Sequence, residues 1–387
     1  MVKAIKVMLI PNNVQKTKMF QYAGASRFAY NWALAREIEN YEKGGKFLSD
    51  AELRKEFTKL RHSDEYTWLL NISNNVTKQA IKDACTAYKN FFRGLQKFPR
   101  FKSKKRSMPK FYQDNVKIRF SNTHVKFEGF SSSRKANKQK MNWVRLAEHG
   151  RIPTDVKYMN PRISFDGLNW WISVCVEFPD CRETLNDDGV GIDLGIKDLA
   201  VCSDGTKYKN INKSQKVKKL EKQKRRLQRS ISRSYEKNKK GESYCKTNNV
   251  IKKEKLLLKR NHRLTNIRKN YLNQTISEIV NRKPRFICIE DLNVSGMMKN
   301  RHLSKAVQAQ GFFWFRKQLE YRCSDKGIQL IVADRFYPSS KLCSCCGNIK
   351  KDLKLSDRVY RCACGNMIDR DFQASINLKT YGEKFAG

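Results

Sequence analysis

The sequence has no long apolar run and few acidic side chains. No stretch approaches the roughly 18 apolar residues that a membrane span needs, which excludes a protein that crosses a bilayer by a helix of this chain. The first residues, MVKAIKVMLIPNN, hold a short apolar run broken by Lys6, with no small-residue cleavage site after it, so they are not typical of a signal peptide. We therefore expect a cytoplasmic protein.

The shortage of acidic residues leaves a large excess of positive charge. Asp and Glu number 37 against 80 Lys and Arg, a formal net charge of +43. A polyanion partner relieves the self-repulsion of such a surface, because phosphates neutralise the cations and release counterions. The alternative is a basic protein that only coats nucleic acid, such as a ribosomal protein. The aromatic content of 11% over 387 residues instead favours a folded protein of about two to four domains.

Cysteine is not scarce, and its pattern indicates a metal rather than disulfides. A cytoplasmic protein keeps its thiols reduced, so twelve cysteines need another role. Two knuckles, C-x-x-C and C-x-C, are separated by fifteen residues, the spacing of a zinc ribbon. Cys345 is a spare thiol in the first knuckle, and four thiolates leave no open position for catalysis by zinc. The expected zinc ligands are Cys343, Cys346, Cys362 and Cys364.

Hydrophobic periodicity predicts different structures in the two halves of the chain. In the first half, strands alternate with a helical block, and the strands are expected to form one barrel around that insertion. Its expected strands are 1–10, 116–120, 125–127 and 171–178, and its expected helices are 16–42 and 74–93. In the second half we expect strands at 189–194, 199–202, 286–290 and 328–333, and helices at 306–323 and 371–381.

A highly basic segment lies inside the second half. Residues 207–270 contain 24 Lys and Arg and only 4 Glu. Apolar residues recur at Val217, Leu220, Leu227 and Ile231, which predicts long helices with one packed seam and a basic outer face. Residues 234–249 lack this seam and are expected to form a loop.

Three acidic residues stand at the ends of apolar elements: Asp193 in VGIDLG, Glu290 in FICIEDL, and Asp371 at the start of the last helix. Each alone is compatible with a turn or a solvated strand end. Together they could bind divalent cations, and two such ions can activate water and stabilise the leaving oxygen in phosphodiester cleavage. A GIDLG strand also opens sugar-kinase and chaperone-like ATPases, but here Ile196 and Lys197 replace the Thr-rich turn, and no glycine-rich phosphate loop follows.

These segments, taken in order, resemble a known family. GIDLGIKDLA, ICIEDLNVSGM, CSCCG and YRCACGNMIDRDFQASINL resemble the TnpB proteins of bacterial insertion sequences, which are relatives of the type V CRISPR effectors. RFAYNWAL and FPRFKSKK resemble the N-terminal signatures of the same family, so the resemblance covers nearly the whole chain.

The resemblance implies an α/β fold with four kinds of domain. A ribonuclease H-like RuvC nuclease domain carries a zinc-ribbon insertion, and an N-terminal wedge barrel carries an inserted helical recognition domain. The implied boundaries are 1–14 and 111–185 for the wedge, 15–110 for the recognition domain, 186–337 and 367–387 for RuvC, and 338–366 for the ribbon.

The implied activity is Mg²⁺-dependent, RNA-guided DNA cleavage at a site with two metal ions. Asp193, Glu290 and Asp371 are the implied catalytic acids and magnesium ligands, Asp371 being the second aspartate of the D-R-D motif rather than Asp369. Gln373 departs from the family's usual Asn, and Ser375 from its Ala, but neither change removes a metal ligand. Relatives that have lost the acids act as guided repressors, so the intact acids here favour cleavage.

The implied partners are a guide RNA from the transposon end and double-stranded target DNA with a short flanking motif, bound by a monomer acting at the nucleoid. Base pairing supplies most of the specificity. Candidate readers of the flanking motif, which could equally form an ordinary helix surface, are Tyr30, Asn31, Lys78 and Gln79. Candidate phosphate contacts are Arg100, Lys102, Lys104 and Lys105. Two other functions share these features: a DNA-binding repressor, and a transposase that joins DNA ends.

Overall fold

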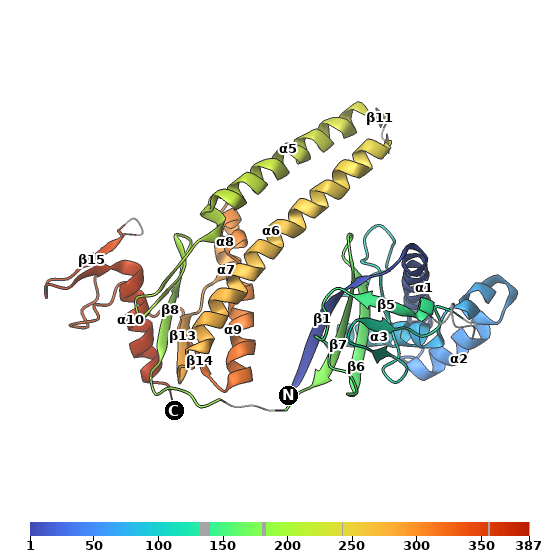
Figure 1. Ribbon diagram of the computed structural model, residues 1–387, viewed down its shortest axis with the longest axis horizontal. Helices are drawn as coiled ribbons and strands as arrows, with labels where there is room; N and C mark the ends of the chain where they lie inside the picture. The colour runs from blue at the N-terminus through green and yellow to red at the C-terminus, as the bar shows by residue number, and fades with distance from the viewer. Residues whose placement is uncertain (132–139, 180–182, 242, 355–356, 387) are drawn as a thin grey trace. The chain divides into compact units, whose positions relative to one another are not determined.

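The computed structural model describes residues 1–131, 140–179, 183–241, 243–354 and 357–386. The chain divides into two compact units, Met1–Pro179 and Asp180–Gly387 (Figure 1). Among the described residues, no helix combines the length and the apolar composition needed to cross a bilayer.

The first unit is built on a seven-stranded antiparallel sheet in the order β2-β6-β7-β1-β5-β4-β3. In β1, Ile5, Val7 and Leu9 share one face, as their alternation predicts, and Val7 and Leu9 are buried. Pairing between β2 and β3, which would close a barrel, is not among the strand pairs of the described residues. The strands are β1 (Val2–Ile10), β2 (Lys110–Tyr112), β3 (Arg119–Phe120), β4 (His124–Lys126), β5 (Trp143–Leu146), β6 (Tyr158–Phe165) and β7 (Trp170–Glu177).

The segment between β1 and β2 is helical, as predicted. Its helices are α1 (Asn13–Glu42), α2 (Asp50–Arg61), the 3-10 helix η1 (Asp64–Asn71) and α3 (Asn74–Phe92), and a further 3-10 turn, η2 (Lys140–Asn142), precedes β5. Tyr22 of α1 packs edge-on against Phe111 of β2 and Phe130. The helices and the sheet therefore share one hydrophobic core.

Two strands of this unit depart from the sequence prediction. The strand expected at 116–120 contains only Arg119 and Phe120, because the Asp114 carboxylate accepts backbone hydrogen bonds from Val116 and Lys117 and holds a turn there. Val116 is accordingly 68% exposed. Strand β6 was not predicted, since Asn160, at φ +49°, interrupts its alternation and shifts its register against β7.

The second unit contains a five-stranded mixed sheet in the order β10-β9-β8-β13-β14. Strands β8, β9 and β10 form an antiparallel meander, whereas β8, β13 and β14 are parallel. Helices α6 and α9 cover one face of the sheet and α10 covers the other (Figure 1). The strands are β8 (Val190–Leu194), β9 (Asp198–Cys202), β10 (Lys207–Lys209), β13 (Phe286–Glu290) and β14 (Gln329–Ala333).

The single helix expected at 306–323 is two helices, α8 (Ser304–Gln310) and α9 (Phe312–Lys326), preceded by α7 (Val294–Lys299). Gly311 separates them at φ +72°, a left-handed conformation that ends α8 and that glycine adopts without a steric penalty. The last helix, α10 (Arg370–Glu383), follows the small antiparallel pair β15 (Val359–Arg361) and β16 (Met367–Asp369).

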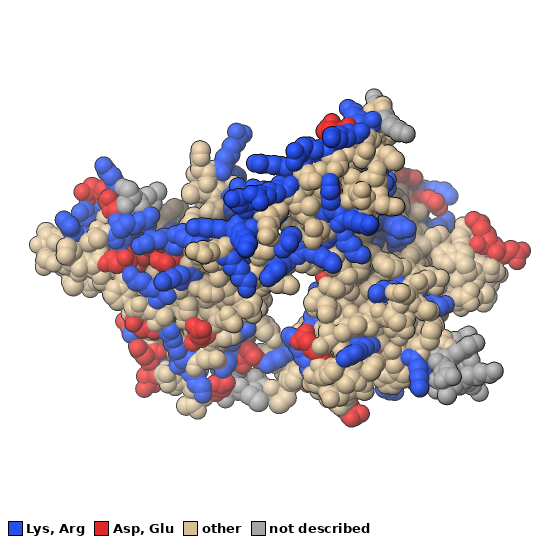
Figure 2. All heavy atoms as spheres, turned by 45° about the horizontal axis from the view of Figure 1, so that its top comes forward, with Lys and Arg blue, Asp and Glu red and all other residues tan. Residues whose placement is uncertain are grey.

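A long helical hairpin leaves the sheet between β10 and β13. The 3-10 turn η3 (Ile211–Lys213) leads into α5 (Gln215–Lys237), a short β11 (Lys239–Lys240) and β12 (Ser243–Tyr244) pair forms the tip, and α6 (Asn248–Asn281) returns. Val217 and Leu220 pack against Leu264, so the predicted seam is present. Lysine and arginine side chains gather over the outer surface of both helices (Figure 2). Helix α5 extends four residues, 234–237, into the expected loop.

Candidate active site and cysteine cluster

The parallel strands β8 and β13 place two of the three acids side by side. Ile192 pairs with Ile289, so the next residues along the strands, Asp193 and Glu290, lie at the same end of the sheet. Because side chains alternate along a strand, both project from the face covered by α10. Gly191 lets that helix approach closely, since a Cβ there would lie 2.1 Å from the Ser375 carbonyl oxygen.

The third acid, Asp371, reaches the same place from the first turn of α10. All three predicted acids line one cavity of about 590 Å³. Its wall also contains basic side chains that the sequence analysis did not single out: Lys197, Lys213, Arg358 and Arg370. The cavity thus combines three carboxylates with four cations.

The electrostatics of the two strand acids are strongly perturbed. Burial, together with the charges of Glu290 and Asp371, holds the pKa of Asp193 well above its ordinary value. Burial also raises the pKa of Glu290, although a hydrogen bond from Ser339 and the charge of Arg370 oppose the rise. Carboxyl groups in this state favour either a proton or a cation.

Ser339 is a component of the site that sequence reasoning missed. It is 4% exposed, and its hydroxyl donates to Glu290 Oε1. Asn377 of α10 holds this segment in turn, because its Nδ2 donates to the carbonyl oxygens of Ser339 and Leu342, each at 2.7 Å. Only the tertiary contact identifies these residues, since a serine after a proline and an asparagine in a helix carry no distinctive sequence signal.

Asp369 has a structural role next to the third acid. Its carboxylate caps α10 by accepting hydrogen bonds from the backbone N–H groups of Asp371 and Phe372, both at 3.1 Å. Its pKa is lowered, despite partial burial, by the Phe372 hydrogen bond and the nearby Lys207. Asp369 does not line the cavity described above.

The four predicted cysteines form a compact cluster. Their sulfur atoms all lie within 4.8 Å of one another, and among the described residues this is the one group of three or more His, Cys, Asp or Glu with ligand atoms that close. The three carboxylates line one cavity, but their oxygen atoms do not all lie as close together as the four sulfur atoms do. Cys345 is exposed and outside the cluster. The clustered residues are Cys343, Cys346, Cys362 and Cys364.

Backbone turns shape each knuckle around the sulfur atoms. Gly347 and Gly365 have φ of +70° and +89°, which allows the chain to fold back after each cysteine pair. The pKa of Cys343 falls to about 6 in spite of its burial, because backbone N–H groups of Cys346 and Cys345 and the Asn366 amide donate to its sulfur. Four converging thiols with one already poised as thiolate fit a tetrahedral cation such as zinc.

The candidate base readers in the first unit have varied environments. Tyr30 is buried, and Asn31 uses its side-chain amide on the backbone of Lys102, donating to the carbonyl oxygen and accepting from the N–H, both at 2.8 Å. Gln79 donates to Asp83 at 2.9 Å, whereas Lys78 is exposed. Base recognition by these four residues stays a prediction, and Lys78 has the geometry most suited to it.

The candidate phosphate contacts divide in the same way. Arg100, Lys104 and Lys105 are exposed, as a phosphate contact requires. Lys102 is half-buried with its ammonium over the Tyr30 ring, and burial together with the charge of Lys110 lowers its pKa to about 7. Lys102 therefore faces solvent less than the other three residues, and phosphate binding by all four stays a prediction.

Three models of known protein families match segments of the chain. A family model described as "Cas12f1-like, TNB domain" matches residues 312–378, and one described as "Probable transposase" matches residues 173–301. A third, described as "Helix-turn-helix domain", matches residues 1–46, which in this chain form β1 and α1.

Relatives align along nearly the whole chain. The "Putative RNA-guided DNA endonuclease InsQ" of Escherichia coli (strain K12) is 31% identical over 93% of this chain and 87% of its own length. A "Putative RNA-guided DNA endonuclease" of Streptomyces pristinaespiralis is 28% identical over 98% of this chain and 89% of its own. In fold, the chain is similar to a Cas12f1 protein solved with its sgRNA and target DNA, with a TM-score of 0.61, 11% identity and 98% of each chain covered.

A cluster of four cysteines, together with a mixed α/β sheet and three acids that line one cavity, is the arrangement expected of a nucleic-acid-processing protein. The identity and coverage of these relatives show that the chain belongs to the TnpB family of insertion-sequence proteins.

Proposed function

We propose that this protein is an RNA-guided DNA endonuclease of a transposable element, cleaving double-stranded DNA beside a short flanking motif. The observation that carries the proposal is the convergence of Asp193, Glu290 and Asp371, from three separate elements, on one cavity. The names of the relatives support the RNA guide and the DNA target. The mixed sheet with acids at one end is compatible with a ribonuclease H-like RuvC domain.

The residues of the cavity fit Mg²⁺. Burial raises the pKa of Asp193 and of Glu290, and neighbouring acids raise it further. Carboxylate oxygens are the ligands that Mg²⁺ prefers. Asp193, Glu290 and Asp371 would hold the metal. When bound, two such ions supply water activation and stabilisation of the leaving oxygen in phosphodiester hydrolysis.

The other side chains of the cavity have supporting roles. Four basic side chains would bind the phosphates that flank the scissile bond. They are Lys197 after β8, Lys213 in η3, and Arg358 and Arg370 beside Asp371. Ser339 orients Glu290 through its hydroxyl. Asp369 fixes the start of α10 and so the position of Asp371.

The remaining elements serve binding. We assign the wedge to 1–14 and 111–185, the recognition helices to 15–110, the RuvC domain to 186–337 and 367–387, and the ribbon to 338–366. The ribbon holds zinc through four cysteines and contacts the target nucleic acid. The basic surface of α5 and α6 holds the backbone of the guide RNA or its heteroduplex, because its many cations have few acidic partners.

A guide exchange tests the proposal. The protein is reconstituted with an RNA from its own transposon end carrying guide A or guide B, and is mixed in Mg²⁺ with a duplex library bearing both targets and randomised flanks. Cleavage that follows the guide, beside one enriched flank, is the expected result. Sequence-specific cleavage by RNA-free protein would contradict the proposal, and joined DNA ends instead of breaks would indicate a transposase in the strict sense.

A further inference from the structure

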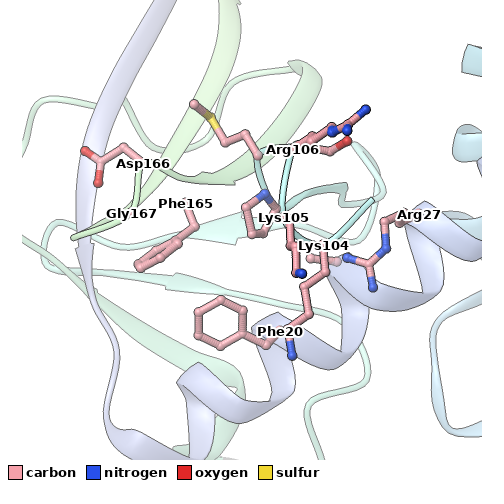
Figure 3. Close-up of a pocket in the computed structure, with 12 residues that line it drawn as sticks. Phe20, Arg27, Lys104, Lys105, Arg106, Phe165, Asp166 and Gly167 are labelled. Carbon is pink, nitrogen blue, oxygen red and sulfur yellow. The ribbon is translucent and has the colours of Figure 1, made fainter. Parts of the chain in front are cut away.

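A second cavity lies in the first unit, whereas the acids and the cysteines belong to the second unit. It has a volume of about 770 Å³ and is formed by α1, the segment 104–109 and the turn between β6 and β7 (Figure 3). One side of it is aromatic and another is cationic, a combination that the nuclease chemistry does not use.

The aromatic side is a supported platform. Phe20 of α1 is 44% exposed although it is a large apolar residue. Its ring meets Phe165 and the buried Trp170 edge-on, with centroid distances of 5.1 Å and 5.0 Å. The ring is therefore held in place from behind while part of its surface stays open to the cavity.

The cationic side carries uncompensated charge. Arg27 projects from α1, and Lys104, Lys105 and Arg106 follow one another in the chain. No ion pair joins any of the four to an acidic side chain within the described parts of the chain. Four like charges around one hollow repel one another, so the site favours an anion.

The one acidic residue of the lining does not neutralise these cations. The Asp166 carboxylate accepts hydrogen bonds from the backbone N–H groups of Leu168 and Asn169 and from Trp171 Nε1, at 2.7–2.9 Å. Figure 3 shows it on the far side of Phe165 from Arg27 and pointing away from the cavity. Its charge thus serves the turn between β6 and β7.

We propose that this cavity binds one unpaired nucleotide of a single-stranded nucleic acid. The base lies against Phe20 and Phe165, and its phosphates contact Lys104, Lys105 and Arg27. Every base has a flat π-face that stacks on an aromatic ring whatever its sequence, while lysine and arginine follow the backbone. A duplex cannot offer an unstacked base, and an acidic peptide leaves the aromatic side without a partner. The proposal stands independently of guided cleavage.

Binding of short oligonucleotides to the full-length protein tests it. RNA and DNA strands of one sequence, and the matching duplex, are titrated by fluorescence anisotropy at a salt concentration that suppresses non-specific phosphate contacts. Phe20→Leu should weaken binding of a single strand about 5- to 100-fold, the size of one base stack, and leave the duplex unchanged. Phe92→Leu, the same substitution at a phenylalanine 53% exposed outside the cavity, should change neither.

The cationic side of the cavity is tested by how the binding affinity depends on salt concentration. The double variant Lys104→Gln/Lys105→Gln should lower the slope of log affinity against log salt by about 1.4 for a single strand, since each phosphate contact contributes about 0.7. Lys43→Gln/Lys46→Gln, two exposed lysines outside the cavity, should leave the slope unchanged.

If Phe20→Leu unfolds the protein, photocrosslinking to the wild-type protein still tests the proposal. A strand carrying 4-thiouridine or 4-thiothymidine should crosslink to the wild-type peptide that contains Phe20, as located by mass spectrometry. If Phe20→Leu weakens binding of the RNA strand alone, or of the DNA strand alone, the bound nucleotide belongs to that nucleic acid, and the result supports the site. Equal losses for single strand and duplex, unchanged binding by folded Phe20→Leu, crosslinks only elsewhere, or Phe20-dependent displacement by an acidic peptide would each overturn it.

Discussion

Gln373 of α10 donates a hydrogen bond from Nε2 to the carbonyl oxygen of Leu342 at 2.6 Å. Its Oε1 accepts from Ser344 at 3.0 Å and from Asn366 at 3.4 Å, and Asn366 also donates to the Cys343 sulfur. The helix that carries Asp371 is thus tied directly to the first cysteine knuckle. Gln373 is fully buried, so these bonds have no competition from water.

We expect Gln373→Met to weaken zinc retention about 10- to 100-fold, the usual effect of losing an outer partner of a metal ligand. Methionine preserves the volume but removes one of the two side-chain donors to the Leu342 carbonyl oxygen and the oxygen that accepts from Ser344 and Asn366. The measurement is the rate of zinc transfer to a chromogenic chelator. Ser375→Ala, on the same helix but bonded only to the Phe372 carbonyl, is the control and should keep the wild-type rate.

Replacing Asp193, Glu290 or Asp371 by the matching amide should lower cleavage about a hundredfold or more while leaving target binding intact, because the metal site supplies several kcal/mol to the transition state only. Cleavage and gel-shift assays on one preparation measure both. Asp187→Asn, an exposed acid outside the cavity, is the control.

Substitution of Asp369 tests whether this residue caps α10 or binds the metal. Asp369→Asn retains a capping side chain and should keep most activity, whereas Asp369→Ala should remain active with a stability lower by about 1 kcal/mol. Loss of cleavage by a folded Asp369→Asn, with Asp371→Asn active, would mean that the wrong aspartate was assigned.

Gly191→Ala should disturb the site without touching an acid. The new Cβ would lie 2.1 Å from the Ser375 carbonyl oxygen and 2.3 Å from the Lys379 nitrogen, both backbone atoms of α10, so the helix must move. We expect a stability loss of about 1–3 kcal/mol and reduced cleavage. Gly24→Ala meets no atom within 4 Å on α1 and should be neutral or slightly stabilising. Equal melting temperatures for the two variants would refute the close packing of β8 on α10.

The raised pKa of Asp193 predicts how stability depends on pH. With its folded pKa above the unfolded value, the folded metal-free protein retains a proton that the unfolded chain releases. The contribution of this group is therefore present at low pH and is lost as pH rises from about 3.9 to the raised value. Melting curves of the wild type in EDTA should show this loss of stability as pH rises. The Asp193→Asn variant should lack the contribution of this group, and Mg²⁺ should stabilise the wild type most at the higher pH. Parallel curves for wild type and Asp193→Asn would contradict it.

Metal analysis of reduced, folded protein should find about one Zn²⁺ per chain. Cys345→Ser should keep the metal because Cys345 lies outside the cluster, and Cys362→Ser should lose it. Retention of zinc by Cys362→Ser together with loss by Cys345→Ser would reassign the ligands.

The sequence predicted most elements whose side chains alternate or recur regularly. Strands β1, β7, β8 and β13 and helices α1 and α3 lie close to their expected positions, because one face of each is continuously apolar. Prediction failed where a single polar side chain or backbone conformation overrides the pattern, as at Asp114, Asn160 and Gly311.

The acids and cysteines could be found from sequence because each stands at the end of an apolar element or in a spaced motif. Lys102 could not be placed, since nothing in FPRFKSKK distinguishes a lysine that folds back over Tyr30 from one that faces solvent. Ser339 contacts Glu290 across a sequence separation of 49 residues, and Asn377 contacts Ser339 across 38. Local sequence patterns do not encode such contacts.

The α5–α6 hairpin extends from the sheet as a two-helix arm. It is anchored at its base, where Arg268 bridges Glu221 at 2.9 Å and Asn212 at 2.7 Å, and its two helices pair along their length (Figure 1). Matched whole turns could therefore be removed from or added to its tip without moving β8, β13 or the acids they carry. The length of the hairpin, and so how far it extends along a bound nucleic acid, can therefore change without altering the acids on the sheet, in evolution and in engineering alike.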